Sequence, residues 1–497
     1  MAGVTLALYL VAFSIPSFLG GLYATPQLTW VTIVGSRLDV ALANTAVIIA
    51  LFALYYLGYR VLAVNAQVPV WAVYLPPVTF ALALMAIYPF GGWDLFLYIS
   101  QGRLYTTHDL NPFLVTPQDA PSDPFFAYSS WWPHPSTYGP AWQMIASLVS
   151  LIGGSNLWLS ILVFKVLVTV FFFASVVLVY LILRTHHPEA RHLGAFLMAW
   201  NPLLLFEIAG NGHNDIVMVF FALLSIYLLT AKRLLWPLPL LTISVLVKYS
   251  FGLLVPGILV YLLALKSSPR KKAVWLLGGL ALSAVTVGLF VRPFGMAYSL
   301  LALFGLEELY LSSPATLLYL ALQGNFPQYA ATTIVKGVVV LMLGTLYVIE
   351  LARFAREHRT LTLDSLLRFG FQAVFFLLLL LPRFHPWFVA WLLGIGVLMV
   401  DSEQTRRVLL LSFTAFLSHI VFYFIWSIYG EQLNYFTIEA MANALIFAPP
   451  LFYWFYSRAR VRKLLLAQKE RTIAVQEAEI GRLKALLSDS RKGLKTR

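Results

Sequence analysis

One carboxylate of this sequence lies at the edge of an apolar segment, where placing an ionisable side chain costs free energy. Asp94 follows two glycines and a tryptophan in the segment PFGGWDLFLY, at the end of a long apolar run. Ionisable residues at a membrane boundary are rare and generally functional, so Asp94 is the first candidate for acid–base chemistry. Aspartate is also a good N-cap, and residues 95–101 could form a short helix that needs one.

Four cations near the ends of expected membrane spans form a second group, which could bind an anion such as a phosphate. They are Lys248, Arg292, Arg383 and His385. An arginine that points inward can hold a phosphate through two hydrogen bonds, whereas one that points outward reaches the lipid headgroups. Lys248 could equally be a buried lysine that is paired with an acid.

Two further segments carry side chains suited to sugars. The segment NGHND places His213, Asn214 and Asp215 at the expected start of a helix, where they could bind hydroxyl groups. His134 and Tyr138 lie in the segment WWPHPSTYGP, and the faces of aromatic rings pack well on sugar rings. The alternative roles are helix caps for the Asn and Asp residues and an interfacial aromatic belt for the tryptophans.

The elements that must position these residues are membrane helices. Of the 497 residues, 60% are hydrophobic and 11% are charged, and the mean hydropathy is +0.81. A soluble domain carries about 25% charged residues, so this chain has too few to cover its surface in water. The absence of cysteine excludes disulfides, thiolate nucleophiles and cysteine-ligated metals. The net charge of +13 does not indicate nucleic acid, because residues 458–497 alone hold 12 basic and 4 acidic residues.

Long apolar runs predict an all-α, polytopic membrane helix bundle in a single domain, residues 1–457, with about twelve spans. The expected spans are residues 3–23, 38–60, 68–90, 157–183, 192–209, 214–231, 273–292, 330–352, 364–381, 386–400, 408–428 and 436–457. Two shorter runs, 234–247 and 249–265, predict a helical hairpin that returns to the same side. The first run lacks a basic segment, so we expect a retained helix rather than a cleaved signal.

The basic residues predict the orientation, because positively charged loops stay in the cytoplasm. Threading the spans puts the clusters 232–233 and 270–272 on the same side as both termini. The expected first outer loop, 91–140, is too long for a tight connection, and its aromatic content argues against disorder. We therefore expect an integral protein of the cell membrane with both termini in the cytoplasm and an active site on the extracytoplasmic side.

The composition changes abruptly near residue 458. Residues 458–497 predict a basic cytoplasmic helical tail, in which Leu466, Ile473, Ile480 and Leu487 recur every seven residues. The companion positions of this repeat are mostly polar, which makes a coiled-coil seam weak. The tail could support weak self-association, or it could lie on anionic membrane lipid.

Several segments, taken in their order along the chain, resemble one family. The segments are Trp93-Asp94 with Tyr98, Gly102, Asn111-Pro112-Phe113, Tyr138-Gly139-Pro140, Gly212-His213-Asn214-Asp215 and Arg383-Phe384-His385-Pro386-Trp387. They are similar to segments of the GT-C polyprenyl-phosphate-sugar-dependent glycosyltransferases, especially the polyprenyl-phosphomannose mannosyltransferases. The resemblance covers most of the membrane region and leaves out the tail.

The resemblance implies a GT-C-like fold in which Asp94 is the catalytic base. A glycosidase needs two carboxyl groups, but a lipid phosphate leaves as a stable anion, so one base and some cations should suffice. A single displacement would invert the anomeric centre. The candidates for the donor phosphate are then Arg383, His385, Arg292 and Lys248, and those for the sugar or acceptor are His134, Tyr138, His213, Asn214 and Asp215. The spacing of possible ligands is not specific for a metal, so we expect no obligatory metal and no cofactor beyond the donor substrate.

The sequence therefore predicts a hexosyltransferase. It would transfer a sugar, in the first place mannose, from a polyprenyl-phosphate donor to a glycolipid or glycan acceptor outside the membrane. The expected partners are that donor, that acceptor and membrane lipid, and not nucleic acid. A lipid-linked-sugar flippase or a secondary transporter is the alternative, since Lys165, Lys248, Lys336 and Arg368 lie in or near expected spans.

Overall fold

The computed structural model describes residues 1–19, 28–64, 68–129, 133–295, 311–357 and 361–460, together with residues 476 and 479–480. The regular elements in these ranges are helices, as expected for an all-α protein. Within the same ranges an isolated bridge pairs Leu311 with Arg383. Most of the tail predicted as a helix over 458–497 lies outside the described residues.

Seven helices of the described ranges are long and apolar enough to cross a membrane. They are α4 (Leu38–Val64), α8 (Leu157–His186), Pro269–Val291, α18 (Gln328–Arg356), α19 (Leu363–Leu380), Glu403–Tyr429 and Tyr435–Arg460. A pair bent by 45°, Pro188–Ala199 and Pro202–Gly210, could add an eighth span. The count of about twelve spans stays a prediction, because several expected spans form helices too short to pass that test.

Two of the long helices, Pro269–Val291 and Glu403–Tyr429, each consist of three consecutive shorter elements. Those six elements and the remaining helices are shorter than a span. They are α1 (Ala2–Tyr9), η1 (Leu10–Ser14), α2 (Ile15–Leu19), α3 (Trp30–Val34), α5 (Val70–Met85), α6 (Asp94–Thr106), η3 (Pro117–Asp119), η4 (Phe126–Tyr128), α7 (Pro140–Gly153), η5 (Pro188–Ala190), α9 (Arg191–Ala199), α10 (Pro202–Leu204), η6 (Leu205–Gly210), α11 (Asp215–Thr230), α12 (Pro237–Val247), η7 (Tyr249–Leu254), α13 (Val255–Ala264), α14 (Pro269–Ala273), η8 (Val274–Gly278), α15 (Gly279–Val291), α17 (Pro314–Gln323), η9 (Pro386–Phe388), α20 (Val389–Gly396), α21 (Glu403–His419), η10 (Ile420–Ile425) and α22 (Trp426–Tyr429). The two runs of the expected hairpin form α12 and, after η7, α13, and they meet at Lys248.

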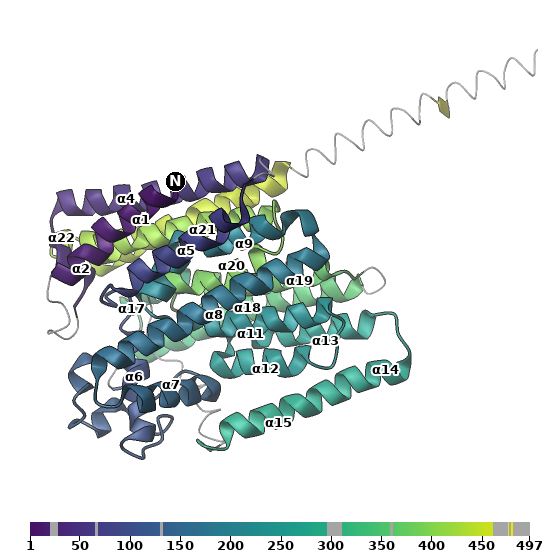
Figure 1. Cartoon of the computed structure of the whole chain (residues 1–497), viewed down its shortest axis with the longest axis horizontal. Coiled ribbons are helices and arrows are strands. Elements are labelled where there is room, and N and C mark those ends of the chain that lie inside the picture. The colour runs from purple at the N-terminus through teal and green to yellow at the C-terminus, as the bar shows by residue number, and fades with distance from the viewer. Residues whose placement is uncertain are drawn as a thin grey trace, which may run out of the picture.

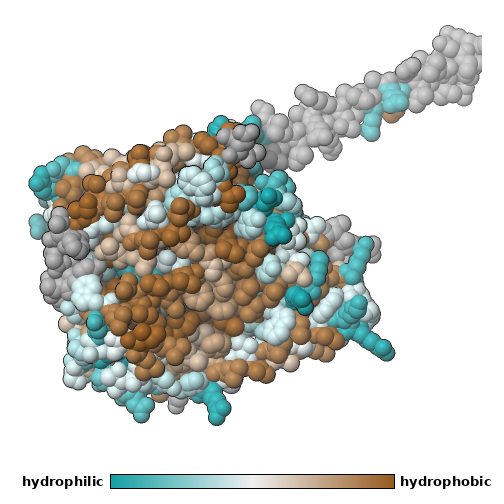
Figure 2. Space-filling model, viewed as in Figure 1, coloured by the Kyte–Doolittle hydropathy of each residue, from teal (hydrophilic) through white to brown (hydrophobic). Residues whose placement is uncertain are grey.

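The molecule has two polar ends. In Figure 1 the helices run mostly from left to right, with α6 at the left end and α14, which carries three basic residues, at the right end. Figure 2 shows hydrophobic residues over most of the middle of this face and hydrophilic residues towards both ends. An apolar middle between two polar ends is the surface that a membrane-spanning bundle needs.

A buried lysine donates hydrogen bonds to the backbone at the C-terminal end of α5. Lys165, in the N-terminal third of α8, is fully buried and donates hydrogen bonds to the backbone carbonyls of Met85 and Ile87. These carbonyls lie where α5 ends and would otherwise lack helical partners. The structure therefore gives Lys165 a structural role, and one of the cations that favoured a transporter has this simpler explanation.

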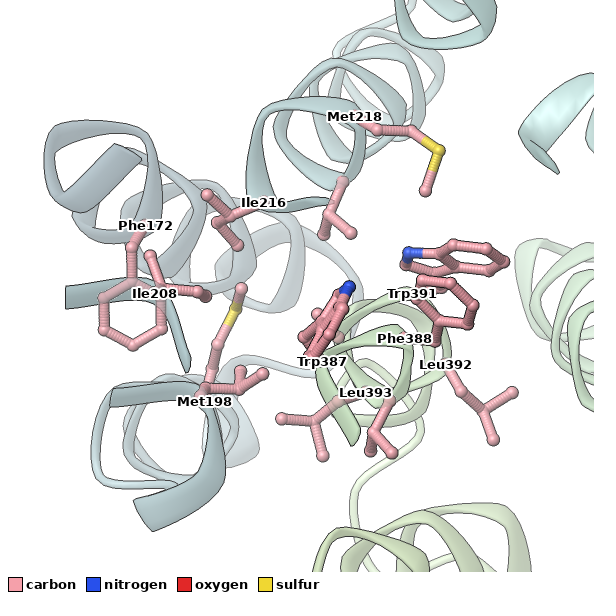
Figure 3. Close-up of a cluster of buried hydrophobic side chains, with 14 of the residues drawn as sticks. Phe172, Met198, Ile208, Ile216, Met218, Trp387, Phe388, Trp391, Leu392 and Leu393 are labelled. Carbon is pink, nitrogen blue, oxygen red and sulfur yellow. The ribbon is translucent and has the colours of Figure 1, made fainter. Parts of the chain in front are cut away.

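Aromatic side chains of η9 and α20 form part of the core beneath the site. Figure 3 shows Trp387, Phe388 and Trp391 close to buried side chains from α8, η6 and α11. The rings of Phe388 and Trp391 stack with their centroids 4.4 Å apart. Because close-packed cores hold side chains in single rotamers, this cluster fixes the chain directly after Arg383 and His385.

Candidate active site

Asp94 occupies the first position of α6, with Trp93 before it as the N-cap residue. The alternative role of Asp94 as an N-cap is therefore not realised. The helix dipole favours a negative charge in this first turn. The Asp94 side chain is 16% exposed, so its carboxylate can meet a ligand.

Two glycines let the segment before Asp94 approach the segment that ends at Asp215. The backbone N–H of Gly91 donates to Oδ1 of Asn211 at 3.1 Å. A Cβ atom on Gly92 would lie only 2.1 Å from the ring of His213. Because neither glycine carries a side chain, Oδ2 of Asp94 comes within 3.8 Å of Nδ1 of His213.

Six of the predicted site residues line one pocket, although they come from four separate parts of the chain. They are Asp94, His134, Tyr138, Lys248, Arg383 and His385. The empty space of the pocket, including its opening, is about 560 Å³. The Asp94 carboxylate thus shares a small cavity with the cations Lys248 and Arg383, which is the arrangement expected for a base beside a bound anion.

Lys248 reaches the pocket from the break between α12 and η7. Its Nζ atom donates to Oδ1 of Asp215 at 2.8 Å and lies 4.6 Å from the ring centroid of Phe388. Gly139 brings the 91–140 loop onto this break, since its N–H bonds to the carbonyl of Val247 at 3.1 Å. Lys248 is therefore both a paired lysine and a pocket residue, so the two predicted roles coexist.

Arg383 and His385 belong to the segment between α19 and η9. This segment is held by Leu311, whose N–H donates to the carbonyl of Pro382 and whose carbonyl accepts from the N–H of Phe384. The His385 ring stacks on Trp387 at 4.2 Å. Burial, and next the charge of Arg383, lower the pKa of His385 well below its usual range. The imidazole is therefore neutral at pH 7, and Arg383 and Lys248 are the charged groups.

Three residues predicted to contact sugar lie behind the pocket rather than in it. His213, Asn214 and Asp215 are almost completely buried and do not line the cavity around Asp94. Asp215 accepts hydrogen bonds from Lys248 and from the indole N–H of Trp391. Their place at the start of α11 explains this burial, because α11 packs against α8, α12 and α20.

Arg292 does not take part in this pocket. It lies at the C-terminal end of α15, is exposed, and is not among the residues that line the cavity with Asp94. The sequence placed it correctly near a span end, but the orientation of that end depends on how α15 packs. Exposure fits the alternative, in which the arginine reaches the headgroups.

Two buried residues that the sequence did not single out, Glu207 and His419, lie near Asp94. Glu207, in η6, is fully buried and accepts hydrogen bonds from His419 at 2.6 Å and from Asn211 at 2.8 Å. Its Oε2 atom also lies 3.3 Å from Nε2 of His213. Glu207 could have been recognised from the sequence, because it is an acidic residue inside the apolar run 192–209 and such residues are rare in membranes.

A second pocket is also lined by Asp94. It is lined by glycines 91 and 92 and by aromatic rings, including those of Trp93, Trp387 and Tyr423, and it also includes His419. Its empty space, including the opening, is about 800 Å³. Asp94 and His385 line both pockets, so the carboxylate can contact two different ligands at once.

His108, a possible metal ligand in the 91–140 loop, is paired within that loop. His108 pairs with Asp123 at 2.7 Å, and Arg103 pairs with the same carboxylate at 2.8 Å. Burial raises the pKa of Asp123, but hydrogen bonds from His108, the Phe125 N–H and Arg103 outweigh it and lower the pKa. Within the described residues, a group with metal-ligand geometry occurs at His186, His187 and Asp364. The expectation that no metal is obligatory stays a prediction.

Comparisons with known proteins give a consistent assignment. The family model described as alpha-(1->6)-mannopyranosyltransferase, N-terminal domain, matches residues 3–264. The chain is also similar to alpha-(1->6)-mannopyranosyltransferase A of Mycobacterium tuberculosis, with 24% identity over 393 residues, or 74% of this chain and 73% of that protein. No solved structure matches the chain.

Proposed function

The chain belongs to the alpha-(1->6)-mannopyranosyltransferase family and is a membrane glycosyltransferase. We propose that it transfers mannose from a polyprenyl-phosphate carrier and that Asp94 is the catalytic base. The observation that carries this proposal is the shared pocket of Asp94, Lys248 and Arg383. A lipid-linked donor suits a protein that is itself embedded in lipid. Its phosphate would meet the two cations.

The chemistry needs one proton acceptor. Asp94 removes the proton of an acceptor hydroxyl while that oxygen forms a bond to the anomeric carbon. The bond between that carbon and the phosphate oxygen breaks, and the electron pair leaves with the phosphate. Arg383 binds the donor phosphate, and Lys248 stabilises the charge that develops on the leaving oxygen. This single displacement inverts the configuration, so an α-linked product requires a β-linked donor.

The two pockets suggest how the substrates are arranged. The pocket with Lys248 and Arg383 takes the donor phosphate and its mannose, with His134 and Tyr138 beside the sugar. The pocket lined by Trp93 and other aromatic residues takes the acceptor, a glycan or glycolipid, since aromatic faces suit sugar rings. Asp94 lies between them, where the acceptor hydroxyl and the anomeric carbon must meet.

The orientation in the membrane is part of the proposal. We place the 91–140 loop and both pockets outside the cell membrane and the basic segment at α14 in the cytoplasm, because positively charged segments stay inside. Both termini then lie in the cytoplasm. The separation of α6 and α14 at opposite ends of the helices supports this arrangement.

The experiment is transfer of radiolabelled mannose by the purified full-length chain in lipid. Synthetic β-linked and α-linked polyprenyl-phosphomannose are compared, with crude membrane lipid and glycan as the acceptor. The proposal predicts a new α-linked product from the β-linked donor alone. Equal use of both donors would refute the inverting mechanism. Movement of the donor between leaflets without transfer would favour the flippase instead.

A further inference from the structure

Behind Asp94 lies a continuous row of buried ionisable side chains. His213 Nδ1 faces Asp94 at 3.8 Å, and its Nε2 atom faces Glu207 at 3.3 Å. The other oxygen of Glu207 accepts from His419 at 2.6 Å. His213 and Glu207 have no exposed side-chain surface, whereas Asp94 is 16% exposed. A substrate can therefore touch Asp94 but not the two residues behind it.

The row is held rigidly from several sides. His213 is stacked on Trp387 with their ring centroids 3.7 Å apart, and Gly92 lies so close that an added Cβ would be 2.1 Å from the His213 ring. Glu207 is fixed by Asn211 and His419. A buried carboxylate is costly unless it is fully hydrogen-bonded, so a sequence that keeps one here has a use for it.

We propose that Glu207 is a positioning residue for the base: it orients His213 so that the Nδ1 atom of the imidazole supports the Asp94 carboxylate from behind. This inference rests on the proposed function. A carboxylate faces each nitrogen of the ring, so His213 supports both as an N–H donor: Nε2–H is directed at Glu207 and Nδ1–H at Asp94. A carboxylate that orients a histidine serves the same purpose in other acid–base sites.

Other titratable groups around Asp94 do not replace this arrangement. Arg383, Lys248 and His385 reach it from the pocket side, where the donor phosphate would engage them. The buried side has His213, Glu207 and His419. The phenol of Tyr98, in α6, also lies near, and burial raises its pKa well above the usual value, so it remains neutral.

The test is the pH profile of mannose transfer by E207Q and H213Q. We expect kcat to fall about 10- to 100-fold, the donor KM to stay within about threefold of wild type, and the acidic limb of the profile to move to higher pH. The two changes together should cost little more than either alone, because they act through one contact. E207D should recover part of the rate, whereas loss of a purely structural carboxylate would not shift the pH profile.

Matched controls separate the outcomes. E403Q removes a half-buried carboxylate at the other end of α21, where it pairs with Arg407 at 3.3 Å, and should keep the wild-type profile. Thermal unfolding identifies variants that do not fold, and H213Q keeps the bonds of Glu207 to Asn211 and His419. A folded E207Q protein with the wild-type rate and profile would overturn this inference. A wild-type chain that transfers no mannose would instead refute the proposed function.

A second group of side chains, at the far end of α8, has the donors of a metal site. His186 is the last residue of α8 and His187 follows it as the C-cap, while Asp364 lies in the first turn of α19. The Nε2 atoms of the two histidines lie 2.9 and 3.4 Å from the same oxygen of Asp364. All three donors are partly exposed, and two of them, His187 and Asp364, line a pocket.

The geometry points to a site for a divalent transition metal such as Zn²⁺ at His186, His187 and Asp364. The three donor atoms lie within 4.8 Å of one another, and ligands of a tetrahedral zinc ion are about 3.3 Å apart. Nδ1 of His187 lies 3.8 Å from Glu189, and metal-binding histidines usually present their second nitrogen to such a group. The ion would join α8 to α19.

Zinc content tests the site. The full-length chain, purified with a histidine-free tag and stripped with a chelator, is dialysed against micromolar Zn²⁺ or Co²⁺. We expect one ion per chain, the visible absorption of tetrahedral Co²⁺, and loss of both in H186Q and D364N. H108Q breaks a comparable pair with Asp123 and should still bind. Binding that is absent in wild type, or unchanged in D364N, would overturn the proposal.

Discussion

Replacing Gly92 by alanine tests how tightly the segment before Asp94 is packed. The new Cβ would lie 2.1 Å from the His213 ring, while ordinary contact begins near 3.4 Å. The two groups must therefore separate by 3.4 − 2.1 = 1.3 Å. His213 cannot yield easily, because Trp387 is stacked on it at 3.7 Å, so Asp94 moves with its loop.

The expected cost follows from that displacement. Overpacking of this kind destabilises a core by about 1–3 kcal/mol, and a shift of about 1 Å at a reacting group costs on the order of 100-fold in rate. We expect G92A to unfold at a lower temperature and to transfer mannose on the order of 100-fold more slowly. Unfolding temperature and kcat are measured on the same purified sample.

Gly252 provides the matched control. It lies in η7, near Lys248, and a Cβ atom there meets nothing within 4 Å. G252A should therefore keep the wild-type rate and stability. A G92A protein that matches G252A in both measurements would show that the loop is not confined by His213, and the packing argument for Asp94 would be wrong.

Two further predictions concern charges. R383A should raise the donor KM about 10- to 150-fold with little change in kcat, because it removes a charged hydrogen bond worth about 1.5–3 kcal/mol. The exposed Arg292 supplies the control, and an equal rise in KM for R292A would contradict the assignment. Since the pKa of Asp123 is lowered in the folded chain, its stabilising contribution is present above the unfolded value of about 4 and is lost as the pH falls through the folded value. Thermal unfolding of D123N should lose that part of the acid dependence, and an unchanged acid dependence would refute it.

The sequence predicted the local features of the site well. Lys248 lies at a break between two short apolar helices, as the runs on either side of it indicated. The possible helix over 95–101 is present, although it begins at Asp94 and Trp93 is its N-cap. The pocket that joins these residues to Arg383 could be anticipated only from the resemblance, because it depends on how α6, α12 and the segment before η9 pack together.

The features that were missed depend on tertiary packing. Glu207 and His419 are separated by 212 positions and lie in apolar stretches, so nothing in either segment indicates the other. Hydropathy also placed His213 at a span boundary without showing that it faces inward. Helix breaks inside the expected spans were missed for the same reason: an apolar run does not reveal a break such as the one between α9 and η6.

The most direct test of the central claim is mannose transfer by D94N beside D109N. Both variants make the same substitution in the 91–140 loop, but Asp109 is exposed, outside both pockets, and has a φ of 56°, which asparagine adopts readily. If Asp94 is the base, D94N should lose at least about 100-fold in kcat while D109N and donor binding remain at wild-type levels. A folded D94N protein with wild-type turnover would contradict the account.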